Sequence, residues 1–128
     1  MNLNKPLNAL LASVLGAGVL LTGAVNAQNY PDKPVTLVVP FAAGGPTDSI
    51  ARLIAVPMGK SLGQTVVVEN APGAGGTVAS NKVAKAKPDG YMIYIHHMGM
   101  ATAQALYDKL PYDPMKDFEY IGQVADVP

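Results

Sequence analysis

The sequence predicts an α/β fold built around a parallel β-sheet. From residue 30 onward, short segments rich in β-branched residues alternate with segments whose apolar residues recur at helical spacing, in the order β-α-β-α-β. Strands that alternate with helices in this way run parallel and are joined by right-handed crossovers. The first strand segment, VTLVV at 35–39, is apolar without interruption, as expected for a strand buried on both faces.

Each element has its own local signal. The first helix is expected to carry apolar residues at every third or fourth position and to end at Gly63. Pro88-Asp89-Gly90 is a turn signal before the third strand. After Gly99 the periodicity fades. The expected segments are strands at 35–39, 65–68, 91–95 and 120–124, helices at 46–62, 78–85 and 100–106, and a proline-rich loop at 110–118.

One residue conflicts with the first helix. Pro57 lies inside the helical pattern, where a proline removes a backbone hydrogen bond and clashes with the preceding turn. The cost in a helix interior is about 3 kcal/mol. The sequence therefore predicts a kink or an early end of this helix near Val56.

The N-terminus has the features of a secretory signal peptide. One lysine and the α-amino group give a weakly positive start, and Ala9–Leu21 is an apolar run too short for a typical membrane span. Val25 and Ala27 form a small-residue cleavage site, so 1–27 is expected to be removed and 28–128 to remain. The absence of a twin arginine favours Sec export and a periplasmic location. The alternative is an uncleaved anchor or a buried helix.

Charge and cysteine content exclude several classes of function. Lys and Arg number 9, as do Asp and Glu, so no basic excess points to a nucleic-acid partner. Cysteine is absent, which excludes disulfides, thiol catalysis, cysteine-bound zinc and a lipid-bearing cysteine.

Two glycine-rich loops are the main candidates for a binding site. PFAAGGPT follows the first strand and PGAGGT the second, so both loops precede a helix at the carboxyl edge of the sheet, where ligands of open α/β sheets bind. Gly45 is expected as the N-cap and Pro46 as the first helical residue. The free N–H groups and the dipole of such a helix start bind anions without a cationic side chain. A small carboxylate or other oxyanion is therefore expected, with Thr47 as a hydroxyl donor and Asp48 as a residue that interacts with the helix dipole in the first turn or caps the helix. The alternative is a pair of ordinary turns.

The two histidines follow the third strand at the same edge. For His96 or His97 we consider a ligand-facing or hinge role, against the alternative of a packed loop residue. Neighbours on a strand point to opposite faces, so joint metal binding is not expected. No catalytic residue is assigned, because no serine lies in a nucleophile-elbow motif and no acid is placed to orient a histidine.

Nucleotide motifs fail on spacing. PGAGGTV has Val78 where the pattern G-x-G-x-x-G requires glycine. GKS at 59–61 would need a glycine at Ile54 to complete a P-loop, and it lies late in a helix. No cofactor is expected.

Several long motifs resemble one known family. YPDKPVTLVVPFAAGGPTDSIARLIA, LGQTVVVENAPGAGGTVASNKVAKAKPDGY and ALYDKLPYDPMKDF closely resemble the Bug-type extracytoplasmic solute receptors of tripartite tricarboxylate transporters. The segment HHMGMATA resembles one subgroup of them. The resemblance extends over residues 30–127 with the motifs in order, which makes it specific.

The resemblance implies a type II periplasmic-binding-protein fold, with two α/β lobes and a ligand cleft between them. It implies a receptor, not an enzyme, that captures di- and tricarboxylates or acidic amino acids and is usually monomeric. The cargo would pass to a membrane permease of one large and one small subunit. Backbone amides and bridging waters would hold the ligand. With the histidines of the same edge, the expected ligand-binding residues are Phe41, Ala42, Ala43, Gly44, Gly45, Thr47, Gly73, Ala74, Gly75, Gly76, Thr77, His96 and His97.

The sequence departs from this family in two ways. Family members are much longer, so 28–128 is expected to be the N-terminal part of lobe one with the start of the crossover toward lobe two. It would be a fragment, either a truncated gene product or an incomplete record, and not competent alone. The second departure is Pro57, where the family usually continues a regular helix. Two other functions stay open: an exported α/β enzyme with its catalytic residues in the missing C-terminal part, and a structural remnant that binds nothing.

Overall fold

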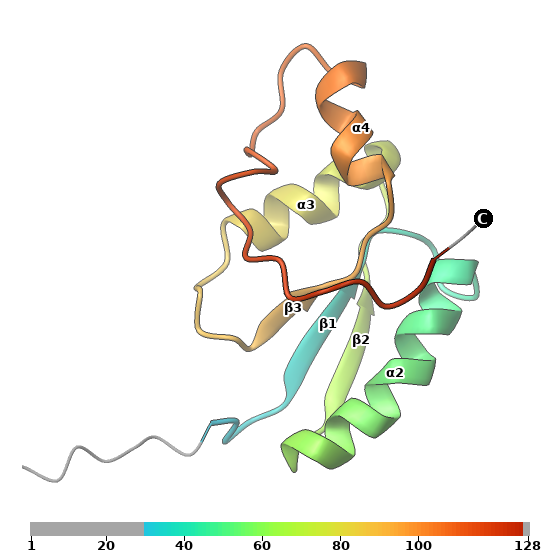
Figure 1. The fold of residues 1–128 in the computed structure, drawn as a ribbon, viewed down its shortest axis with the longest axis vertical. Coiled ribbons are helices and arrows are strands. Elements are labelled where there is room, and N and C mark those ends of the chain that lie inside the picture. The colour runs from blue at the N-terminus through green and yellow to red at the C-terminus, as the bar shows by residue number, and fades with distance from the viewer. Residues whose placement is uncertain (1–29, 127–128) are drawn as a thin grey trace, which may run out of the picture.

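The computed structural model describes residues 30–126, so the expected signal peptide and its cleavage site lie outside the described residues. The chain forms an α/β unit in which helices flank a small sheet (Figure 1). In chain order the elements are β1 (Val35–Val39), α2 (Pro46–Leu62), β2 (Val66–Asn70), a 3₁₀ turn η1 (Ala74–Gly76), α3 (Thr77–Ala84), β3 (Met92–Tyr94) and α4 (Gly99–Leu106).

The sheet is parallel and has the strand order β2-β1-β3. Val35 pairs with Val66 and Val39 with Asn70 along β2, whereas Leu37 pairs with Ile93 on β3. The predicted β-α-β-α-β order and the parallel sheet are thus confirmed. The carboxyl ends of all three strands lie at one edge.

The helices cover the two faces of the sheet. The chain connects β1 to β2 through α2, and β2 to β3 on the other side of β1 through α3. The two connections run in opposite directions along the sheet. Because both crossovers are right-handed, the two helices lie on opposite faces. Helix α2 packs on β1 and β2, and α3 packs on β1 and β3 (Figure 1). Leu37 and Val39 are therefore almost completely buried and form a core with Ala51 of α2.

Helix α2 has the predicted caps but does not end early. Gly45 is the N-cap, Pro46 occupies the first turn, and Gly63 closes the helix in the left-handed conformation, with φ of 68°. Of the two predicted outcomes, a kink or an early end near Val56, the early end is wrong, because the helix continues through Pro57 to Leu62. Pro57 lies on the exposed face of α2, so water can hydrate the carbonyl that the missing N–H leaves free.

The last predicted strand is also wrong. Residues 119–126 belong to neither a helix nor a strand. A strand needs a neighbour for its backbone groups, and the β-ladders of residues 30–126 join only β1, β2 and β3. Tyr120 and Ile121 are accordingly exposed, by 66% and 89%.

In the described part of the chain, the helices are too short or too polar to cross a membrane.

Candidate functional site at the carboxyl edge of the sheet

Three segments meet at the carboxyl edge of the sheet. Residues 41–45 follow β1, residues 71–76 follow β2, and His96 and His97 follow β3. We call 41–45 the first loop and 71–76 the second loop. Because the strands are parallel and adjacent, the sheet brings these segments together, as the sequence predicts.

The first loop turns sharply into α2. Gly44 has φ of +82°, a conformation that residues with a side chain rarely adopt. The N–H of Gly45 donates to the carbonyl of Ala42 at 3.4 Å, and the N–H of Gly44 donates to Asp48 Oδ2 at 2.8 Å. In residues 30–126 the N–H groups of Ala42, Ala43 and Thr47 have no protein acceptor. In the described residues these amides, together with those of Phe41 and Asp48 and unlike that of Gly44, are unpaired donors of the first loop and helix start.

Asp48 is a buried acid behind the first loop. Its side chain is 3% exposed, and its carboxylate accepts hydrogen bonds from Gly44 N–H, from Arg52 Nε at 2.9 Å and from Asn70 Nδ2 at 2.9 Å. The hydrogen bond from Arg52, followed by those from Gly44 and Asn70, holds the pKa of Asp48 well below its usual range. Asp48 thus stays ionised and acts on the loop and helix start, in line with the capping role expected from the sequence.

Asn70 joins this network from the next strand. Its Nδ2 donates to Asp48 Oδ1 and to the carbonyl of Phe41 at 3.0 Å, and its Oδ1 accepts from Arg52 Nη2 at 3.3 Å. Neither Asn70 nor Arg52 was among the residues expected from the sequence. The spacing of Asp48 and Arg52, four apart on a helix, is a readable signal for their ion pair, whereas the contact of Asn70 depends on the tertiary structure.

The second loop is built from residues with positive φ. Gly73, Ala74, Gly75 and Gly76 have φ of 146°, 43°, 63° and 97°. The N–H of Gly76 donates to the carbonyl of Gly73 at 2.9 Å, and Thr77 Oγ1 donates to the carbonyl of Ala74 at 3.0 Å. The Thr77 hydroxyl therefore donates within the loop. This conformation explains why glycine predominates here.

Side chains from three elements support the second loop from behind. Ser80 of α3 is fully buried, and its Oγ donates to the carbonyl of Gly76 at 3.1 Å. The hydroxyl of Tyr94 lies 2.9 Å from Ser80 Oγ, and that of Tyr107 donates to the carbonyl of Ala74 at 3.1 Å. Burial raises the pKa of Tyr94, so its hydroxyl keeps its proton.

The two histidines pack around Phe41 of the first loop. The ring of His97 stacks on Phe41 with centroids 4.7 Å apart, and the ring of His96 meets Phe41 edge-on at 5.8 Å. The expectation that the two side chains point to opposite faces is thus wrong, because β3 ends at Tyr94 and both histidines follow it. Both rings belong to the site rather than to the sheet faces.

His96 also contacts the second loop. A Cβ built on Gly76 would lie 2.7 Å from His96 Nε2, so the imidazole packs directly against this glycine. Burial, with a smaller effect of the neighbouring His97, lowers the pKa of His96 to about 4. At neutral pH a half-buried, uncharged imidazole therefore lies between the two loops.

The arrangement suits an anion better than a metal ion. In residues 30–126, no three His, Cys, Asp or Glu side chains gather closely enough to hold a metal. The edge instead presents unpaired N–H groups at the start of α2, where the helix dipole favours negative charge. The chemistry available to the described residues is hydrogen bonding to an oxyanion.

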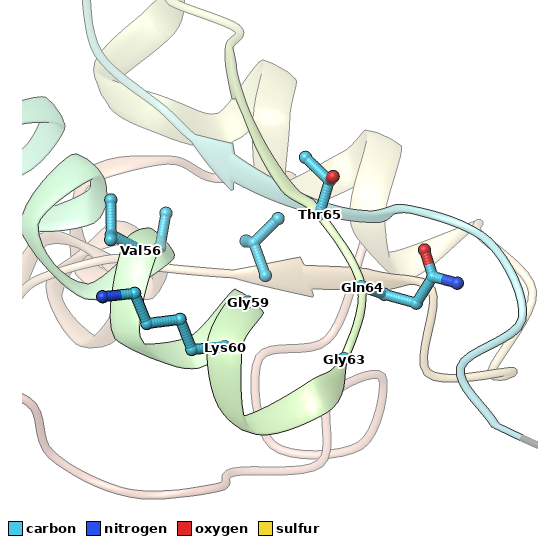
Figure 2. A pocket seen from close by; sticks show the side chains of 8 residues that line it. Val56, Gly59, Lys60, Gly63, Gln64 and Thr65 are labelled. Carbon is cyan, nitrogen blue, oxygen red and sulfur yellow. The ribbon is translucent and has the colours of Figure 1, made fainter.

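Two surface hollows of the described residues are lined by residues outside the glycine loops. A shallow hollow of about 470 Å³ lies between the end of α2 and the start of β2, at the opposite edge of the sheet (Figure 2). Val56, Lys60 and Gln64 line it, and they present no convergent set of donors (Figure 2). A second hollow, of about 290 Å³, lies near Tyr107 and Tyr112. We therefore place the candidate site at the loops from their hydrogen-bonding chemistry, not from the size of a cavity.

Comparison with known proteins identifies the family. The model of the tripartite tricarboxylate transporter family receptor matches residues 50–128. A UPF0065 protein from Agrobacterium vitis is 48% identical over 95% of this chain and 36% of its own length, and BugT of Bordetella pertussis is 35% identical over 100% of this chain and 39% of its own. The chain thus spans little more than a third of these relatives.

Solved structures agree with this match. The periplasmic binding protein BugD is 56% identical, with a TM-score of 0.71, over 73% of this chain and 31% of that protein. MatC from Rhodopseudomonas palustris with bound malate is 52% identical, with a TM-score of 0.67, over 70% of this chain and 31% of that protein. An R. palustris protein with adipate is 42% identical, with a TM-score of 0.64, over 67% of this chain and 29% of that protein. The chain therefore belongs to the tripartite tricarboxylate transporter receptor family, and its fold is part of that of the periplasmic binding proteins.

Proposed function

We propose that this chain is the N-terminal part of a periplasmic receptor that captures a small carboxylate for a tripartite tricarboxylate transporter. The observation that carries the proposal is the 52% identity to MatC, whose structure contains malate. The unpaired N–H groups of the first loop support it, because they offer a carboxylate the donors that it requires.

In this proposal both loops contribute N–H donors to the ligand. The amides of Ala42, Ala43 and Thr47 receive one end of the ligand, and the exposed N–H groups of the second loop lie beside them. His96, uncharged at neutral pH, separates the loops and excludes water from the space between them. Binding without a covalent step follows, because the site offers hydrogen-bond donors and no assembled nucleophile and base.

The proposed partners are a membrane permease and the carboxylate itself. We infer that the mature receptor is monomeric and reaches the periplasm after Sec-type export and cleavage behind Ala27. Mass spectrometry of the protein purified from the periplasm tests the export and the cleavage. An N-terminus at Gln28 would support both. A retained Met1 would contradict the cleavage.

A ligand screen tests the carboxylate proposal. The protein expressed from its complete reading frame is heated with malate, adipate, citrate or aspartate, and with the neutral diamide of malate as control. At least one carboxylate is expected to raise the melting temperature, because ligands that bind only the folded state stabilise it. A melting temperature unchanged by all of them would reject the proposal.

We further expect residues 28–128 alone to bind poorly. This chain covers only 31% and 29% of the two relatives with bound ligand, so it would supply only one wall of their site. Calorimetry on this segment and on the protein from the complete reading frame compares the two. Equal affinity for malate would show that the segment needs no further residues.

A further inference from the structure

We propose that Asn70 is a positioning residue for the binding site: by holding the carbonyl of Phe41, its side-chain amide aims the N–H of Ala42 at the ligand. This inference rests on the proposed function, since it assigns a role in carboxylate binding to a residue that would not itself touch the carboxylate.

The geometry of the peptide bond carries the first step. Asn70 Nδ2 donates to the carbonyl oxygen of Phe41 at 3.0 Å. That carbonyl and the N–H of Ala42 belong to one planar, trans peptide unit, so they point in opposite directions. Fixing the carbonyl toward Asn70 therefore directs the N–H of Ala42 away from Asn70. Ala42 is exposed, and in the described part of the chain this N–H has no acceptor.

The next peptide repeats the arrangement. The carbonyl of Ala42 accepts from Gly45 N–H at 3.4 Å, which turns the N–H of Ala43 away from the start of α2. Two successive peptide units thus have a carbonyl that accepts a hydrogen bond and an N–H that is unpaired. Successive backbone amides of this kind form a concave site for an anion.

The orientation of Asn70 is itself determined by its neighbours. Asp48 is an ionised carboxylate and can only accept, so the group facing its Oδ1 at 2.9 Å must be the NH₂ of Asn70. Arg52 can only donate, so the group facing its Nη2 at 3.3 Å must be the oxygen of Asn70. One amide hydrogen pairs with Asp48, and the other is directed to the carbonyl of Phe41.

Asn70 also links the two loops. It is the last residue of β2, and the following residue, Ala71, starts the second loop with its N–H donated to the carbonyl of Val39 at 2.8 Å. The side chain that aims the first loop therefore lies at the base of the second. Movement of either loop changes the placement of both sets of donors.

Calorimetry with malate tests the proposal on the protein expressed from its complete reading frame. Asn70→Ala is expected to weaken malate binding by about tenfold or more, the loss expected when a hydrogen bond to a charged group is misdirected. Asn81→Ala is the matched control, because Asn81 lies on α3 and its Oδ1 has no partner among the described residues. Its affinity should stay within about twofold of the wild type. Equal affinities of Asn70→Ala and the wild type would overturn the proposal, even if the variant melts at a lower temperature.

Nuclear magnetic resonance on the wild-type protein provides a second test, which does not depend on the variant's folding. On addition of malate, the amide signals of Ala42 and Ala43 should shift strongly, whereas that of Gly44, which is bound to Asp48, should shift little. The opposite ranking would overturn the proposal. If none of the four carboxylates of the ligand screen binds the wild type, the proposed function fails, and the ligand-free spectra decide the role of Asn70. An unchanged Phe41 carbonyl-carbon signal in Asn70→Ala would then reject it.

Discussion

The carboxylate of Asp48 accepts the N–H of Gly44 at 2.8 Å, so the protein's own buried anion occupies the inner side of the first loop. A buried charge so close to a proposed carboxylate site is tolerated because Arg52 lies 2.9 Å away and neutralises it. The loop therefore has an inner side that binds Asp48 and an outer side whose amides are free.

The first prediction concerns Asp48→Asn. At pH 7 this variant should melt at a lower temperature than the wild type, because the charge-assisted bonds to Arg52 and Gly44 are weakened. The folded pKa of Asp48 is depressed, so its stabilising contribution is present above the unfolded value of about 4 and is lost as pH falls through the folded pKa. The difference in melting temperature should thus shrink below about pH 4. The control is Asp108→Asn at an exposed position, which should show no such difference.

The second prediction concerns Gly76→Ala. The new Cβ would lie 2.7 Å from His96 Nε2 and 3.2 Å from Pro40 Cβ, at φ of +97°. The matched control is Gly63→Ala, where φ is +68° but nothing lies within 4 Å. Both variants should lose about 1–2 kcal/mol of unfolding free energy from backbone strain. Only Gly76→Ala should also displace His96 and weaken malate binding. Equal affinities in the two variants, measured by calorimetry, would refute this contact as part of the site.

The third prediction concerns Tyr94 and Ser80. Their hydroxyl groups are 2.9 Å apart beneath the carbonyl of Gly76. Tyr94→Phe and Ser80→Ala should each reduce the unfolding free energy by about 1 kcal/mol, because each leaves a buried polar group without one of its partners. The double variant should lose less than the sum, which urea denaturation measures. Strictly additive losses would mean that the two hydroxyl groups do not interact.

The fourth prediction concerns the titration of His96. Its pKa is lowered to about 4, mainly by burial, whereas an unfolded histidine titrates at about 6.5. Between these values the unfolded chain binds the additional proton, so stability should fall as pH decreases from about 6.5 to about 4. This difference in pKa corresponds to about 3 kcal/mol, and solvent screening of the partly exposed ring lowers the expected loss to on the order of 2 kcal/mol. The loss should be absent in His96→Phe. A His96 imidazole signal that titrates near pH 6.5 would contradict the packing described here.

Local sequence patterns were sufficient to predict the three strands of the sheet and the caps of α2. The run VTLVV becomes the central strand because two crossovers cover both of its faces, and Gly45, Pro46 and Gly63 bound α2 as their conformational preferences require. The positions of both glycine loops follow from the parallel order alone.

The failures have physical causes that lie outside local sequence. Pro57 does not end α2, because the packing of α2 on the sheet outweighs one missing hydrogen bond on an exposed face. Asn70 could not be found, because its bonds to Asp48 and Phe41 span 22 and 29 residues. The placement of the histidine rings could not be predicted either, because β3 ends at Tyr94. The alternation of side chains along a strand therefore does not apply to His96 and His97.

Calorimetric titration of the protein from its complete reading frame, with malate and with the neutral diamide of malate, tests the central claim most directly. If amides at the carboxyl edge of the sheet receive a carboxylate, malate should bind with a measurable heat at pH 7 and its diamide should not. The ionised carboxylate accepts stronger, charge-assisted hydrogen bonds from the free N–H donors and is favoured by the helix dipole, whereas the neutral amide carbonyl is not charged. Equal binding of both compounds, or binding of the diamide alone, would contradict the account.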